Sequence, residues 1–126
     1  WCSPLKNTGM VTDAIWSDVD NDGKIDLVVA GELMAISIFK NTGNGFQAMP
    51  SGLEGYMGWW NSLAAGDFDG DGDTDFLAGN LGKNNPYRVD AQKPVVVFAK
   101  DLDKNGSIEA LTFCSSKMLD GSEQLC

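Results

Sequence analysis

Three short acidic loops of the same design restrict what this chain can fold into. Each loop has oxygen-bearing side chains at positions 1, 3, 5 and 9 and a glycine at position 6, and each lies between two short apolar runs. So many carboxylates in so few residues repel one another unless a cation lies among them. Oxygen ligands at this spacing, with a glycine for the sharp turn, are typical of sites for calcium and other hard cations. The sequence therefore predicts three calcium loops.

The predicted ligands follow from the loop positions. Side chains at positions 1, 3, 5 and 9 would bind the ion, and position 7 would bind through its backbone carbonyl. We call the stretches 18–26, 67–75 and 101–109 loop one, loop two and loop three. Loop one supplies Asp18, Asp20, Asp22, Lys24 and Asp26, loop two supplies Asp67, Asp69, Asp71, Asp73 and Asp75, and loop three supplies Asp101, Asp103, Asn105, Ser107 and Glu109.

The helix–loop–helix calcium hand is the main alternative to this interpretation. Its loop closes with a bidentate glutamate at position 12. Position 12 is Val29, Ala78 and Thr112 in the three loops, so none of them offers a carboxylate there. The residues after each loop form short, partly alternating apolar runs bounded by glycine or polar residues, which favours strands over helices. Each loop is therefore predicted to join two strands.

The runs around the loops define three repeat units, 10–46, 58–85 and 94–126, of which the last is incomplete. The first unit is predicted to contain strand, calcium loop, strand, turn, strand and turn, with its second strand over 25–30. That is most of a four-stranded antiparallel sheet. The first aspartates of the loops are 49 and then 34 residues apart, so the segments outside the repeated motif vary in length.

Composition narrows the possible functions. The net charge is −9, but 12 of the 18 acidic residues lie in the loops, and three Ca²⁺ ions would change the net charge to −3. Without a basic patch, binding of nucleic acid is not expected. No apolar run reaches the roughly 18 residues of a membrane span, so the chain is not expected to cross a membrane. The chain has no histidine, the commonest general base, and we do not expect an enzyme.

Three cysteines and the start of the sequence bear on where the protein works. Cys114 and Cys126 are candidates for a disulfide, which would leave Cys2 over. The sequence begins at Trp1, without an initiator methionine or a signal peptide, which indicates a piece of a longer protein. Calcium loops of this openness suit compartments with millimolar free calcium. We therefore expect an extracellular, cell-surface or periplasmic location.

The loops and their flanking strands carry a resemblance. Residues 66–73 read Gly-Asp-Phe-Asp-Gly-Asp-Gly-Asp, and similar loops lie between short strands along residues 10–114. This pattern resembles the FG-GAP/VCBS repeats of integrin-type β-propellers, and the stretch 58–84 is similar to bacterial extracellular proteins of that class. The Phe-Gly and Gly-Ala-Pro signatures are not spelled out, however, and loop three departs from the pattern at positions 5 and 9. The resemblance implies an all-β fold with about two and a half antiparallel blades of a β-propeller, and calcium loops between the strands.

The resemblance implies a scaffold that binds or adheres to a protein or carbohydrate ligand, which the sequence does not identify. Trp59 and Trp60, beside Asn61, are candidate ligand-binding residues because adjacent indoles can stack on a sugar ring, although packing between sheets is the more ordinary use of such aromatics. Two alternatives stay open: part of a propeller-type polysaccharide-degrading enzyme such as a lyase, and a purely structural spacer. A lyase would need a base, for which Tyr87, Arg88 and the lysines are the candidates.

A propeller usually closes with four to eight blades. About two and a half blades do not close, so this sequence is expected to be an excerpt of a longer propeller. In an open arrangement, the terminal sheet edges would be exposed. Exposed edges pair readily with other strands, and self-association of the chain is therefore a further expectation.

Overall fold

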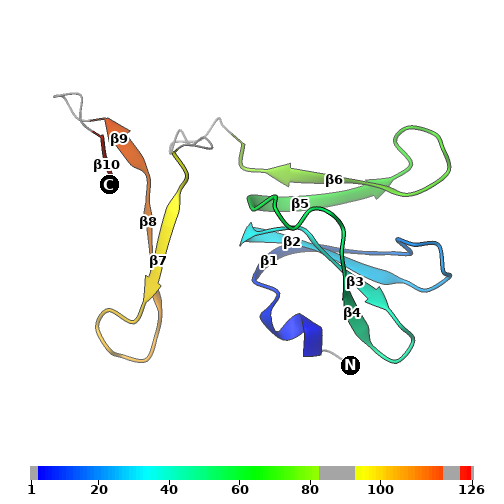
Figure 1. Ribbon diagram of the computed structural model, residues 1–126, viewed down its shortest axis with the longest axis horizontal. Coiled ribbons are helices and arrows are strands. Elements are labelled where there is room, and N and C mark those ends of the chain that lie inside the picture. Colours follow the sequence, from blue (N-terminus) through cyan, green and yellow to red (C-terminus); the bar gives the residue numbers. More distant parts are fainter. Residues whose placement is uncertain (1–2, 83–92, 118–122, 126) are drawn as a thin grey trace. The chain divides into compact units, whose positions relative to one another are not determined.

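The computed structural model describes residues 3–82, 93–117 and 123–125 (Figure 1). Within these residues the chain forms ten strands and one short 3-10 helix, η1 (Ser3–Asn7), and every strand pair is antiparallel. The prediction of an all-β fold is confirmed. The chain divides into two compact units, Trp1–Leu81 and Gly82–Cys126.

The first unit is a single six-stranded sheet. β1 pairs with β2, β2 with β3, and β3 with β4, so the first four strands form an antiparallel sheet connected by hairpins. β2 also pairs with β5, which in turn pairs with β6. The strands are β1 (Met10–Ser17), β2 (Asp26–Met34), β3 (Ser37–Asn41), β4 (Phe46–Met49), β5 (Gly58–Gly66) and β6 (Asp75–Asn80).

The second unit contains two separate strand pairs. β7 (Val96–Lys100) pairs with β8 (Glu109–Phe113), and β9 (Ser115–Lys117) pairs with β10 (Glu123–Leu125). The rings of Phe98 and Phe113 meet edge to face at 5.4 Å and hold the first pair together on one side.

All three acidic loops join two paired strands, as predicted: β1 to β2, β5 to β6, and β7 to β8. The last residue before each loop lies opposite its ninth position in the strand register, as Ser17↔Asp26, Gly66↔Asp75 and Lys100↔Glu109. The three loops therefore close at the same place. Loops one and two lie at the same end of the first sheet (Figure 1).

The core lies along β2. Six consecutive residues, 26–31, are buried, and the apolar residues that follow Asp26 in this stretch are typical of a strand covered on both faces. The core cluster contains Leu27, Val29, Met34 and Phe39, and Leu5 of η1 packs against it. The sequence placed the end of this strand at residue 30, which is wrong. β2 continues to Met34 through a left-handed backbone at Leu33, with φ of 57°.

β1 and β5 share an irregularity that joins them. The register of each strand skips one residue, Thr12 in β1 and Asn61 in β5, at the same distance before the following loop. At the first of these bulges the hydroxyl of Thr12 donates to the carbonyl of Trp60 at 2.7 Å. The carboxylate of Asp13 accepts from the N–H of Leu63 at 2.7 Å. These two bonds link the strands that lead into loops one and two.

Some sequence predictions lie outside the described residues. Cys2 and Cys126 are among them, so the predicted disulfide between Cys114 and Cys126 falls outside as well. Tyr87 and Arg88, the candidate bases of a lyase, also fall outside. In the described part of the chain there is no helix with the length and apolar character needed to cross a membrane.

Candidate metal centres

Backbone amides fold loop one around the side chain of its first residue. The carboxylate of Asp18 accepts from the N–H of Asp22 at 3.0 Å and of Gly23 at 2.8 Å. The carboxylate of Asp22 accepts from the N–H of Lys24 at 2.9 Å. Gly23 has a φ of 83°, which strains any residue that has a Cβ. The glycine at position 6 therefore allows the loop to wrap around Asp18.

Loop three repeats these contacts, and in loop two the first carboxylate accepts from position 4 instead of position 5. At position 1, Asp67 accepts from Gly70 at 2.7 Å and Gly72 at 3.1 Å, and Asp101 accepts from Asn105 at 3.1 Å and Gly106 at 2.9 Å. In both loops the side-chain oxygen at position 5 accepts from the N–H at position 7, at 3.0 Å and 2.7 Å. Three loops far apart in sequence thus share the amide of position 6 on the first carboxylate and the amide of position 7 on the side chain of position 5.

The ninth position ties each loop back to its own start. Its carboxylate accepts from the N–H of position 2, in the pairs Asp26 with Val19, Asp75 with Phe68, and Glu109 with Leu102, at 3.1, 2.8 and 2.7 Å. Asp26 is completely buried, and its second oxygen accepts from the N–H of Asn41 in β3 at 2.7 Å. The carboxylate of Asp26, the first residue of β2, therefore holds both loop one and β3.

Each loop brings three carboxylates close enough to share one ion. Their oxygens lie within 4.8 Å of one another, and they occupy positions 1, 3 and 5 in loops one and two but positions 1, 3 and 9 in loop three. These groups are Asp18, Asp20 and Asp22; Asp67, Asp69 and Asp71; and Asp101, Asp103 and Glu109. Among the predicted ligands, Asp26 and Asp75 are not in these groups. An all-oxygen set of this kind fits a hard divalent cation.

Position 7 was predicted to bind through its backbone carbonyl. The structure places the N–H groups of Lys24, Asp73 and Ser107 on the side-chain oxygen at position 5. That contact orients the position 5 side chain. The carbonyl contribution of these three residues stays a prediction.

Two lysines reach the carboxylates of loop one. The ammonium of Lys40, in β3, contacts Asp20 and also lies 2.9 Å from Asp22. The ammonium of Lys24 lies 3.0 Å from Asp22. Lys40 and then Lys24 lower the pKa of Asp22 to about 2, and the two aspartates raise the pKa of Lys40 above its usual range. Lys40 could not be found from local sequence patterns, because it lies 20 residues from Asp20 along the chain.

The aspartates of loop two have different charged neighbours from those of loop one. Within residues 3–82, no lysine or arginine forms an ion pair with its carboxylates. A hydrogen bond with Asp71 and the negative charge of Asp71 raise the pKa of Asp73, whereas the N–H of Asp73 lowers the pKa of Asp71.

The comparison with known families decides the identity of this region. The profile of the FG-GAP-like repeat matches residues 18–78, from the first aspartate of loop one to three residues beyond loop two. These residues form an FG-GAP-like repeat. The resemblance predicted from the sequence is confirmed for this stretch, and the antiparallel sheets are consistent with blades built from such repeats. No curated protein and no solved structure matched the chain. An FG-GAP-like repeat is a structural or binding module and is not catalytic by itself.

The repeat brings one of its three predicted ligand-binding residues to a surface hollow. Trp60, with Ile36, Leu53 and Tyr56, lines a wholly apolar hollow of about 160 Å³. Its indole lies over Gly58, and its ring N–H is buried without a hydrogen-bond partner in the described structure.

The other two predicted ligand-binding residues, Trp59 and Asn61, lie in β5 and do not line this hollow. Trp59 lies opposite Glu32, and its backbone N–H donates to the side chain of Asn80 at 3.3 Å. Asn61 is the exposed bulge residue of β5. Sequence reasoning missed Tyr56, which is 67% exposed and follows a turn with no strand pattern.

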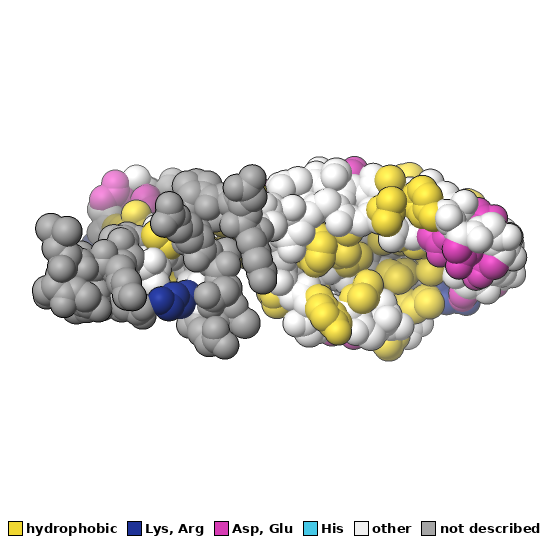
Figure 2. Space-filling model, turned by 90° about the horizontal axis from the view of Figure 1, so that it is seen from above, with side chains coloured by type: hydrophobic (Ala, Val, Ile, Leu, Met, Phe, Trp, Pro, Cys, Tyr) yellow, Lys and Arg dark blue, Asp and Glu magenta, His cyan; other side chains and the backbone are white. Residues whose placement is uncertain are grey.

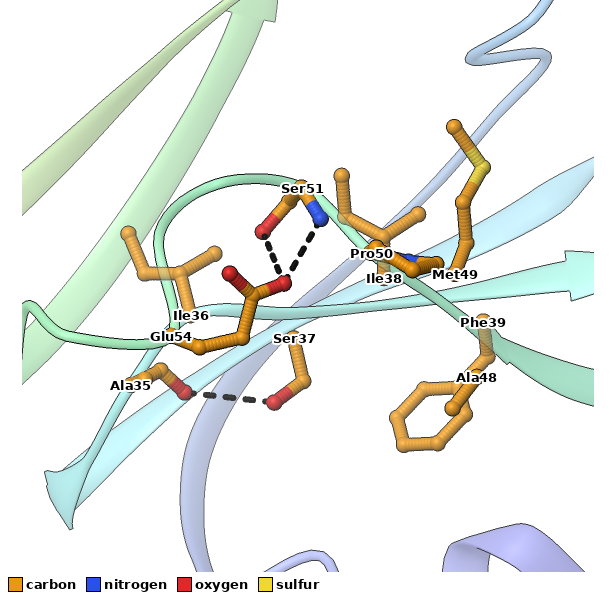
Figure 3. Close-up of a pocket in the computed structure, with 10 residues that line it drawn as sticks. All are labelled: Ala35, Ile36, Ser37, Ile38, Phe39, Ala48, Met49, Pro50, Ser51 and Glu54. Atoms are coloured by element: carbon orange, nitrogen blue, oxygen red, sulfur yellow. Dashed lines mark hydrogen bonds between the residues drawn. The ribbon is translucent and has the colours of Figure 1, made fainter.

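A second hollow of about 320 Å³ lies beside the first, and Ile36 borders both. Figure 3 shows its lining, in which Glu54 is the single charged side chain. The Glu54 carboxylate accepts from the N–H of Ser51 at 2.7 Å, and this bond lowers the pKa of Glu54. Because Glu54 bonds within its own turn, the hollow offers mainly apolar surface.

Proposed function

We propose that this chain is a calcium-binding part of an extracellular β-propeller that serves as a scaffold for binding a protein or carbohydrate. The observation that carries the proposal is the repeated loop conformation. In all three loops, backbone amides hold the first carboxylate, and two further carboxylates converge on it. Folding such groups together costs electrostatic energy, which a bound Ca²⁺ would offset.

Calcium would act as a structural ion. Each loop connects a strand that enters it to a strand that leaves it, so an ion held by the loop would stabilise that strand pair. Figure 2 shows acidic side chains gathered at one end of the first unit. Binding to the folded loop but not to the unfolded chain would raise stability by about 1.4 kcal/mol per site when free calcium is tenfold above the dissociation constant.

Titration calorimetry of the chelator-stripped protein with Ca²⁺ and with Mg²⁺ tests this proposal, with circular dichroism before and after. We expect measurable heat of Ca²⁺ binding, weak competition by Mg²⁺, and a stronger β-sheet signal in the circular dichroism spectrum once Ca²⁺ is bound. Asp69→Asn should weaken loop two at least about tenfold, because it removes a ligand charge. Asp73→Asn is the comparison variant: it removes the same charge at a position where the backbone is the predicted ligand, so it should weaken loop two less than Asp69→Asn does. If Ca²⁺ releases or absorbs no heat and the circular dichroism spectrum does not change, calcium binding is refuted.

The ligand proposal rests on the hollow beside Trp60. Its lining is apolar and includes the exposed ring of Tyr56, and aromatic faces of this kind stack on sugar rings. A glycan array followed by fluorescence titration of any hit would test the proposal. Tyr56→Ala should weaken binding at least about fivefold, whereas Phe68→Ala, which removes an exposed ring outside this hollow, should not.

Two other results would redirect the proposal. Release of unsaturated products from an acidic polysaccharide would favour a lyase. Failure to bind any glycan or protein would favour a purely structural spacer.

A further inference from the structure

Loop one contains a positive charge of its own at the place where a metal ion would bind. The ammonium of Lys40 contacts Asp20 and Asp22, which occupy positions 3 and 5 of the loop. Lys24, at position 7, adds a second ammonium 3.0 Å from Asp22. Two of the three carboxylates that converge in this loop are thus already paired with cations of the chain.

The fold fixes the position of Lys40. β3 pairs with β2 up to Leu27↔Phe39, so Lys40 follows directly beside the end of the loop. The next residue, Asn41, is bonded to the loop through both its backbone and its side chain. Its backbone N–H donates to Asp26 at 2.7 Å, and its side-chain amide donates to the carbonyl of Ile25 at 3.1 Å. The backbone that carries Lys40 is therefore held by β2 on one side, through Phe39, and by the loop on the other, through Asn41.

Loop two differs at the corresponding points. Its position 7 is Asp73, which adds a negative charge where loop one has the lysine. In the first 82 residues, as far as the structure describes them, its carboxylates meet no lysine or arginine in an ion pair. The two loops share a backbone conformation but have opposite local charge at position 7.

We propose that Lys40 is an internal cation of loop one that takes the place of calcium there. Loop one would then be held together without metal and would bind Ca²⁺ more weakly than loop two, because the ion must displace an ammonium from its ligands. This inference rests on the proposed calcium binding of the loops. It adds that the repeat has one metal-independent loop and one metal-dependent loop.

The glycine at position 6 gives a separate reporter for each loop. The amides of Gly23 and Gly72 donate to the first carboxylate of loops one and two, so they sense any rearrangement at that carboxylate. A calcium titration followed by ¹⁵N–¹H correlation spectra resolves the two sites in the full chain. In the unaltered protein we expect Gly72 to reach half-saturation at about tenfold lower calcium than Gly23.

Lys40→Gln should lower, about tenfold, the calcium concentration at which the amide signal of Gly23 is half-saturated. The corresponding concentration for Gly72 should not change. Lys40→Arg keeps the charge and should behave like the unaltered protein. Lys6→Gln is the matched control, because Lys6 is an exposed lysine in η1. In chelator, Lys40→Gln should lower the melting temperature of the first unit, whereas Lys6→Gln should not.

The outcomes separate this inference from the function on which it rests. If Gly23 and Gly72 saturate together and Lys40→Gln moves neither, calcium binding stands and the role of Lys40 is refuted. If neither glycine responds to calcium in any variant, the proposed function is refuted and the inference with it.

Discussion

Replacing Asp26 by asparagine should destabilise the protein even when no calcium is present. Asp26 was predicted as a metal ligand, yet its side chain is completely buried and both of its oxygens accept backbone hydrogen bonds. One bond, to Val19, closes loop one, and the other, to Asn41, holds β3 against it. The change Asp26→Asn keeps the size of the side chain but replaces one acceptor by a donor.

The magnitude follows from these two bonds. A hydrogen bond to a charged group contributes about 1.5–3 kcal/mol, and a buried donor left without an acceptor costs about 1–3 kcal/mol. Asparagine can satisfy only one of the two amides and presents its NH₂ group to the other. We therefore expect the free energy of unfolding to fall by about 2–4 kcal/mol. That is a large part of the roughly 5–15 kcal/mol that keeps a typical domain folded.

Urea unfolding in the presence of a chelator measures this loss without any contribution from metal binding. Asp75→Asn is the matched control, since Asp75 has the same position in loop two but is only half-buried and can turn its remaining oxygen toward Phe68. We expect the control to lose less than about 1 kcal/mol. Equal losses for the two variants, or a loss below about 0.5 kcal/mol for Asp26→Asn, would refute the reasoning.

Three other predictions concern packing, charge and association. Gly58→Ala should lower the melting temperature and the yield of folded protein, because a Cβ there would lie 2.5 Å from the indole of Trp60. A variant as stable as the original would contradict this prediction. A carboxyl NMR titration should find the pKa of Asp22 near 2, so its contribution to stability is present above about pH 4 and lost as the pH falls toward 2. Lys40→Gln should return that pKa toward 3.8, and an unchanged pKa would argue against the ion pair. In sedimentation experiments the chain should associate through the edges of β4 and β6, which end the strand order β4-β3-β2-β5-β6 in the described structure. A lysine introduced in β6 should reduce this association. A chain that stays monomeric at all concentrations would argue against the prediction.

The loops and their strands could be predicted because their signals are local. Oxygen-bearing side chains at positions 1, 3 and 5 and a glycine at position 6 determine the loop conformation within nine residues. The apolar runs on either side have the length and the bounding residues of strands. This is why the sequence located all three loops between paired strands and excluded the calcium hand.

The features that sequence reasoning missed depend on contacts between distant residues. Nothing near Lys40 in the sequence indicates that β3 brings it to Asp20. The end of β2 was placed too early because Gly31 and Glu32 look like turn residues. In the fold, Gly31 is instead required by a close approach to the carbonyl of Met10, and the strand runs on past it. Only the pairing of β2 with β1 makes that requirement visible.

The pairing of β2 with three strands has a consequence for how the first unit unfolds. β2 contacts β1, β3 and β5, and Thr12 and Asp13 add side-chain bonds from β1 to β5. Separating the first four strands from β5 and β6 would break these bonds and expose the end of β2. The two hairpins that carry loops one and two should therefore melt in a single cooperative transition. An ion bound at one loop would then protect the other from unfolding, although the two share no ligand.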